Sequence, residues 1–79
     1  MKETFSTSDL GLATFLYTSG CAIKDVTYNN GRSTFLFQSQ NVDINELVAG
    51  WQKGDCMVNA VAFFNNMAFI KRKALDKNT

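Results

Sequence analysis

An Asn-Gly pair, Asn30-Gly31, separates two extended runs at residues 21–28 and 32–38. Both residues tolerate positive φ, and this pair is the strongest short signal for the two-residue turn that joins antiparallel strands. A one-residue slip of the register would mix polar and apolar side chains on each face, so we expect Val26 to lie opposite Phe35. The predicted hairpin then has Val26, Tyr28, Phe35 and Phe37 on one face and Ile23, Asp25, Thr27, Thr34 and Leu36 on the other.

Helical spacing of apolar residues occurs on both sides of this hairpin. The first helix is predicted over about 7–18, where Ser6 serves as N-cap and Asp9 closes a capping box. The second is predicted over about 44–53, directly after the capping residue Asp43.

A third helix is predicted over about 59–75, with Asn59 as its N-cap and residues 76–79 as a tail. Residues 1–79 therefore form one small α+β domain with the order helix, hairpin, helix, helix. Residues on one stripe of the last helix are expected in the core: Ala60, Phe63, Phe64, Met67, Ile70 and Ala74.

The chain contains no histidine, which removes the usual nucleophile–base arrangements and the commonest ligand for zinc. Cys21 and Cys56 are too few for a four-ligand zinc site, and they are read either as one disulfide or as two buried thiols. The carboxylates are scattered along the sequence. We therefore expect no catalytic residue, no metal, no cofactor and no small-molecule substrate, and hence no enzyme.

Basic residues gather at the end of the third helix, at Lys71, Arg72, Lys73 and Lys77. They are read either as a patch for an anionic partner or as cations that complement the negative end of a helix dipole. Phe69 lies off the predicted core stripe, close to these cations. Phe69, Lys71, Arg72 and Lys73 are therefore the predicted contact residues for a protein partner.

An alternative for the same basic end is weak, sequence-nonspecific binding of nucleic acid. The residues expected to meet phosphates are Arg32, Lys71, Arg72, Lys73 and Lys77.

The second strand of the hairpin offers another candidate contact, because it is strongly β-prone and contains neither proline nor lysine. Pairing with a second copy would give a four-stranded sheet across a homodimer, and monomer and dimer both stay open. The residues expected at this edge are Arg32, Thr34, Leu36 and Gln38.

The opening helix and the later motifs resemble a small family of unknown function that occurs in bacterial, archaeal and viral genomes. Its T-S-D-L-x-L-A-x-x-L helix is matched from Thr7 to Leu16, and its F-x-F strand by Phe35-Leu36-Phe37. Val58 to Phe64 and Ile70 to Leu75 stand where the family carries V-x-A-x-x-F-F and a basic run. The resemblance implies an association with phage or mobile elements and no catalytic residue. Ser19 and Phe69 depart from the family pattern, which favours Phe69 as a contact particular to this chain.

The sequence thus predicts a non-enzymatic interaction module that binds another protein. No stretch approaches the roughly 20 apolar residues of a membrane-spanning helix. The first ten residues are polar and do not resemble a signal peptide. A cytoplasmic location without a membrane partner is expected.

Overall fold

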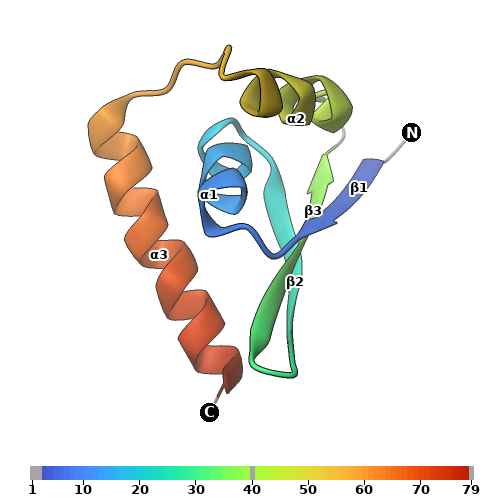
Figure 1. Ribbon diagram of the computed structural model, residues 1–79, viewed down its shortest axis with the longest axis vertical. Helices are drawn as coiled ribbons and strands as arrows, with labels where there is room; N and C mark the ends of the chain where they lie inside the picture. The colour runs from blue at the N-terminus through green and yellow to red at the C-terminus, as the bar shows by residue number, and fades with distance from the viewer. Residues whose placement is uncertain (1–2, 40, 79) are drawn as a thin grey trace.

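Three antiparallel strands form the sheet, one more than the hairpin alone provides (Figure 1). The computed structural model describes residues 3–39 and 41–78. Along the chain the elements are β1 (Glu3–Thr7), α1 (Leu10–Thr18), β2 (Ala22–Asn29), β3 (Arg32–Ser39), α2 (Ile44–Lys53) and α3 (Ala60–Asn78). The predicted α+β class is confirmed, and the strand order β1-β3-β2 places β3 in the centre.

The predicted hairpin turn is confirmed. Asn30 and Gly31 have φ angles of 54° and 77°, which the type I′ turn requires. Val26 lies opposite Phe35, as predicted. A β-bulge between Ile23 and Asp25 then shifts the register, so that Ile23 pairs with Phe37. Placing Ile23 on the polar face was therefore wrong, because the extra residue in the bulge turns its side chain back to the core.

The start of the first helix differs from the prediction. Ser6 is not an N-cap but lies in β1, which pairs with β3 from Glu3↔Ser39 to Thr7↔Phe35. The helix begins at Leu10, and the Asp9 carboxylate caps it by accepting the backbone N–H of Leu12 at 3.1 Å. Pairing with β1 gives the backbone N–H and C=O groups along one edge of β3 their hydrogen-bond partners. If residues 3–7 formed an additional helical turn instead, these groups of β3 would lose those partners.

All three helices lie on the same side of the sheet, with α1 between α3 and the strands (Figure 1). Five consecutive residues of α1, from Leu12 to Leu16, are buried. They pack against the inward face of the sheet and against Ile44 of α2 and Ile70 of α3. The buried apolar core consists of Leu12, Ala13, Phe15, Leu16, Cys21, Val26, Phe35, Phe37, Ile44 and Ile70.

The last helix is longer than predicted, because α3 continues to Asn78 in place of a tail from residue 76. Thr79 lies outside the described residues. Phe63 and Ala74 pack against the core as expected, Met67 is partly buried, and Ile70 is fully buried. Placing Phe64 and Ala60 in the core was wrong, since both are exposed. Within the described part of the chain, no helix has the length and apolarity needed to cross a membrane.

Candidate interaction surface

The basic side chains at the end of α3 point to different sides of the helix. Lys73 faces the bulged part of β2, whereas Lys71 faces the hairpin tip and the start of α1. Arg72 is exposed. The side chain of Lys77 lies outside the described residues. Lys71, Arg72 and Lys73 therefore do not form one continuous basic face.

Phe69 is part of the contact between α1 and α3. Its ring stacks on Tyr17 with a centroid distance of 5.1 Å, and the Lys73 ammonium lies 5.4 Å from the ring centroid. One turn earlier, the Asn66 side-chain amide donates a hydrogen bond of 2.9 Å to the hydroxyl of Thr18. With 39% of its surface exposed, Phe69 contributes mainly to packing between the two helices.

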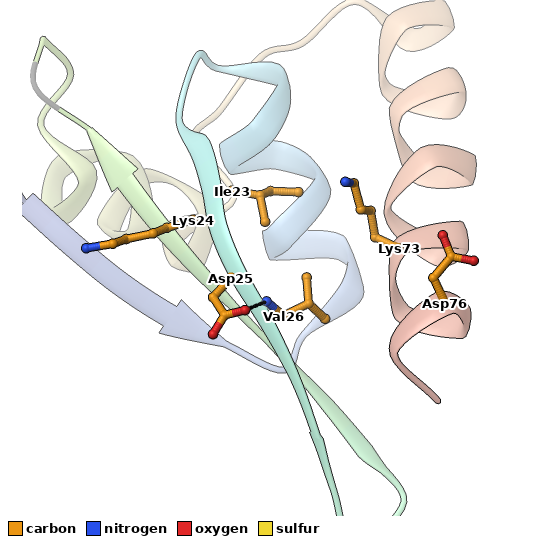
Figure 2. A pocket seen from close by; sticks show the side chains of 6 residues that line it. All are labelled: Ile23, Lys24, Asp25, Val26, Lys73 and Asp76. Carbon is orange, nitrogen blue, oxygen red and sulfur yellow. Dashed lines mark hydrogen bonds between the residues drawn. The ribbon is translucent and has the colours of Figure 1, made fainter. Parts of the chain in front are cut away.

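A depression of about 310 Å³ lies between α3 and β2 (Figure 2). Its charged residues balance, with two lysines and two aspartates in the lining. The Asp25 carboxylate accepts the N–H of Val26 at 2.9 Å, and Lys24 points away from Lys73. The charges in the lining balance, and the two lysine side chains point apart. This depression therefore has no concentration of charge that would attract an anion or a cation.

A larger depression, of about 480 Å³, lies beside the hairpin tip, and we call it the basic groove. Arg32 and Lys71 both line it, so two residues of the predicted nucleic-acid set meet here. The described lining includes these two cations and no carboxylate. Apolar residues make up much of the remaining lining, which consists of Ser8, Leu10, Gly31, Ser33, Phe35, Ala74 and Leu75.

An apolar stripe on the outward side of α3 is the feature that sequence analysis missed. Val61 is 69% exposed, Phe64 73% and Leu75 63%, and Ala68 is exposed between them. We call these four residues the outer stripe. Positions 61, 64 and 68 are neighbours on a helix surface, and Leu75 follows two turns later. Just before the helix, Met57 is 97% exposed.

The sequence did carry a signal for this stripe. Positions 63, 67, 70 and 74 form one series of helical spacings, and positions 61, 64, 68 and 75 form another. Two adjacent phenylalanines point about 100° apart on a helix, so Phe63 and Phe64 belong to different series.

The predicted dimer edge is wrong for Leu36 and Gln38. These residues pair with Ser6 and Thr4 of β1, because β3 is the central strand. Arg32 and Thr34 lie beyond the segment that β1 pairs, and the Thr34 hydroxyl shares a hydrogen bond of 2.9 Å with Ser8.

The outer edge of the sheet next to the helices is formed by β2, which carries the bulge at Lys24. Bulges and edge lysines oppose pairing between sheets. β1 forms the other edge of the sheet, and pairing of the sheets of two copies stays a prediction.

Cys21 is buried in the core and Cys56 is partly buried, and both are thiols in the structure. No group of three His, Cys, Asp or Glu side chains among the described residues is arranged to hold a metal ion. Two aspartates have local roles at helix N-termini, because Asp9 and Asp43 each accept a backbone N–H of the first turn.

Comparison with known families covers nearly the whole chain. The model of one family, Domain of unknown function (DUF5659), matches residues 2–76. The chain belongs to this family. The match extends from β1 through most of α3, so the strand that sequence analysis missed lies within the family domain. No curated protein and no solved structure matches significantly.

Proposed function

We propose that this DUF5659 domain is a non-enzymatic protein-interaction module that binds through the outward side of α3. The observation that carries the proposal is the exposure of Phe64, nearly three-quarters of whose surface is open, between Val61 and Ala68. Contiguous apolar surface of this kind is typical of protein contact sites in soluble domains. The basic groove adjoins the stripe, since Leu75 belongs to both.

This proposal changes the expected contact residues. Lys71 stays in the proposed surface because it lines the basic groove. Phe69 and Lys73 contact each other on another side of the helix, so they are not at its centre. An interaction surface commonly has an apolar centre and a polar rim, and Phe64 with Lys71 along α3 fits that arrangement.

The nucleic-acid alternative has weaker support. Binding along a phosphate backbone requires cations that follow one face. Here Arg32 and Lys71 meet at a groove with an apolar floor, while Lys73 lies over the ring of Phe69. The association with phage or mobile elements and the cytoplasmic location stay predictions.

Photo-crosslinking tests the proposed surface in cells that carry the gene natively. Benzoylphenylalanine is placed at position 64, and at the exposed position 27 on β2 as a control. We expect a protein adduct, with another protein or with a second copy, from position 64 and none from position 27. A folded protein that gives no adduct at position 64 would contradict the proposal.

A further inference from the structure

We infer that the basic groove binds an extended peptide segment of the partner that carries carboxylate and apolar side chains. The inference rests on the proposed function only in taking the partner to be a protein. Its site is a different one, between the hairpin tip and the end of α3. An unpaired stretch of strand edge and the charge of the groove lining point independently to this occupant.

The strand edge is unpaired because β1 covers only part of β3. Pairing with β1 stops at Thr7↔Phe35, whereas β3 begins at Arg32. Within the described chain, residues 32–34 therefore have a strand partner on one side alone, which is β2. In Figure 1 this stretch is the lower part of the hairpin, beside the C-terminal end of α3, and both line the basic groove.

Ser33 directs its backbone groups to the open side. Asn29 and Arg32 flank the two-residue turn, so they form a hydrogen-bonded pair across the hairpin. In antiparallel strands such pairs alternate with pairs whose N–H and C=O groups point outward, and Ser33 belongs to the next pair. No strand of the described chain meets these groups of Ser33. An open strand edge of this kind pairs readily with an extended peptide.

The charge of the groove lining selects an acidic peptide. Arg32 lines the groove from the hairpin and Lys71 from α3, and both residues are exposed. The described lining contains no carboxylate that would neutralise them. Asp76, the acidic residue nearest to Lys71 in the sequence, lines the depression between α3 and β2 instead. A carboxylate on the bound peptide is therefore complementary to the groove.

The remaining lining favours apolar side chains beside that carboxylate. Leu10 and Ala74 are partly buried in the groove, and Leu75 is exposed where the groove meets the outer stripe. An apolar side chain of the peptide covers this surface, while an acidic neighbour reaches the cations. A partner that also contacts Phe64 can occupy both sites, because Leu75 belongs to each of them.

Other ligands fit the groove less well. Sites for small molecules bury most of the ligand, whereas this groove is open, with Arg32, Lys71 and Leu75 all exposed in its lining. Single-stranded nucleic acid stacks its bases on exposed aromatic rings. The aromatic residue of the described lining is Phe35, which is only 2% exposed, so it offers no ring for stacking.

Nuclear magnetic resonance of the nitrogen-15-labelled full chain tests the inference with three synthetic octapeptides. The first alternates glutamate with valine, the second alternates lysine with valine, and the third is the first with its backbone nitrogens methylated. We expect the glutamate–valine peptide to shift the amide signals of Ser33 and Leu75 saturably. The other two should bind about tenfold more weakly, because each loses one set of hydrogen bonds or charge contacts.

Three results would overturn the inference. The glutamate–valine peptide may leave the signals of Ser33 and Leu75 in place, or the lysine–valine or methylated peptide may bind as tightly as the first. An oligothymidylate that shifts these signals when the glutamate–valine peptide does not would assign the groove to nucleic acid.

Charge reversal in the protein tests the two cations. Lys71→Glu should weaken binding of the glutamate–valine peptide about tenfold, because it removes one charge contact. Lys24→Glu makes the same charge change at an exposed position of β2 and should leave binding unchanged. The double variant Arg32→Glu, Lys71→Glu should prefer the lysine–valine peptide. The dispersion of the amide signals verifies that each variant is folded, and an unreversed preference in the folded double variant contradicts the inference.

The two proposals fail in distinguishable ways. If position 64 crosslinks to a protein and the glutamate–valine peptide does not bind, the proposed function stands and this inference is overturned. If the peptide binds in the groove and position 64 gives no adduct, the inference stands and the outward side of α3 is not the contact surface.

Discussion

Replacing Phe64 with alanine should barely change the stability of the monomer, although Phe64 is a large apolar residue in a helix. About a quarter of its surface is covered. For a phenylalanine of roughly 200 Å² this is about 50 Å², which corresponds to about 1.3 kcal/mol at ~25 cal/mol per Å². Alanine has a higher helix propensity than phenylalanine, which raises the free energy of unfolding of the variant by about 0.5 kcal/mol. We expect a net loss in the free energy of unfolding below about 1 kcal/mol.

Ile70 provides the matched comparison, since it lies on the same helix and is completely buried. Ile70→Ala removes packed methyl groups and leaves a cavity, which costs about 2–5 kcal/mol. A domain of 79 residues has a total stability of about 4–12 kcal/mol, so this loss is a large fraction of it. The two substitutions should therefore differ by at least about 1 kcal/mol.

Urea denaturation at low micromolar protein, followed by the fluorescence of Trp51, measures both effects. Trp51 stacks on Phe15 at 5.3 Å and on Phe63 at 6.4 Å, so its emission reports the packing of the core. The midpoint should shift strongly for Ile70→Ala and little for Phe64→Ala, with similar slopes. Equal losses would refute the reasoning, because they would place Phe64 in the core.

Three further predictions concern the caps and the basic residues. Asp9→Ala should cost about 1 kcal/mol in thermal unfolding through loss of the N-cap of α1, while Ser6→Ala should cost little because Ser6 is exposed in β1. If Ser6→Ala lowered the melting temperature and Asp9→Ala left it unchanged, the helix would instead start at residue 7. Gly54→Ala should cost about 1 kcal/mol, since Gly54 caps α2 with a φ of 73°; no change in the melting temperature would argue against that cap. Fluorescence anisotropy with labelled DNA and RNA at low salt should stay flat, and a salt-dependent rise would favour the nucleic-acid alternative.

The hairpin turn and the caps of α2 are predictable because their signals are local. Asn30-Gly31 requires only its own backbone conformation to specify a turn, and the register then follows from the alternation of Val26, Phe35 and Phe37. Asp43 and Gly54 likewise mark the two ends of α2 as expected. Such features depend on neighbours within a few residues of the chain.

The first strand could not be predicted in this way. Residues 3–7 contain one apolar side chain, Phe5, and pair with a segment more than 25 residues away. Ser6 and Asp9 also have the spacing of a capping box, and this local pattern competes with the long-range pairing. The pairing with β3 decides whether residues 3–7 form a strand or lead into a helix capped by Ser6. The local sequence does not contain that information.

The proposed interaction surface is predictable from the sequence only in part. Lys71 and Arg32 were singled out, but nothing local places the hairpin tip beside the end of α3. Phe69 was expected to be a free contact residue, yet Tyr17 packs against it from α1. The helical spacing predicts a core position for Phe64 only if two separate series of positions are taken as one stripe.

The emission of an indole at position 64 tests most directly whether the outward side of α3 is a contact surface. The variant combines Phe64→Trp with Trp51→Phe, so that position 64 carries the only tryptophan. We predict emission typical of a water-exposed indole for the purified protein at nanomolar concentration, and a shift to shorter wavelength when a protein partner covers position 64. Emission typical of a buried indole at every concentration would contradict the account, because Phe64 would then belong to the core of the monomer.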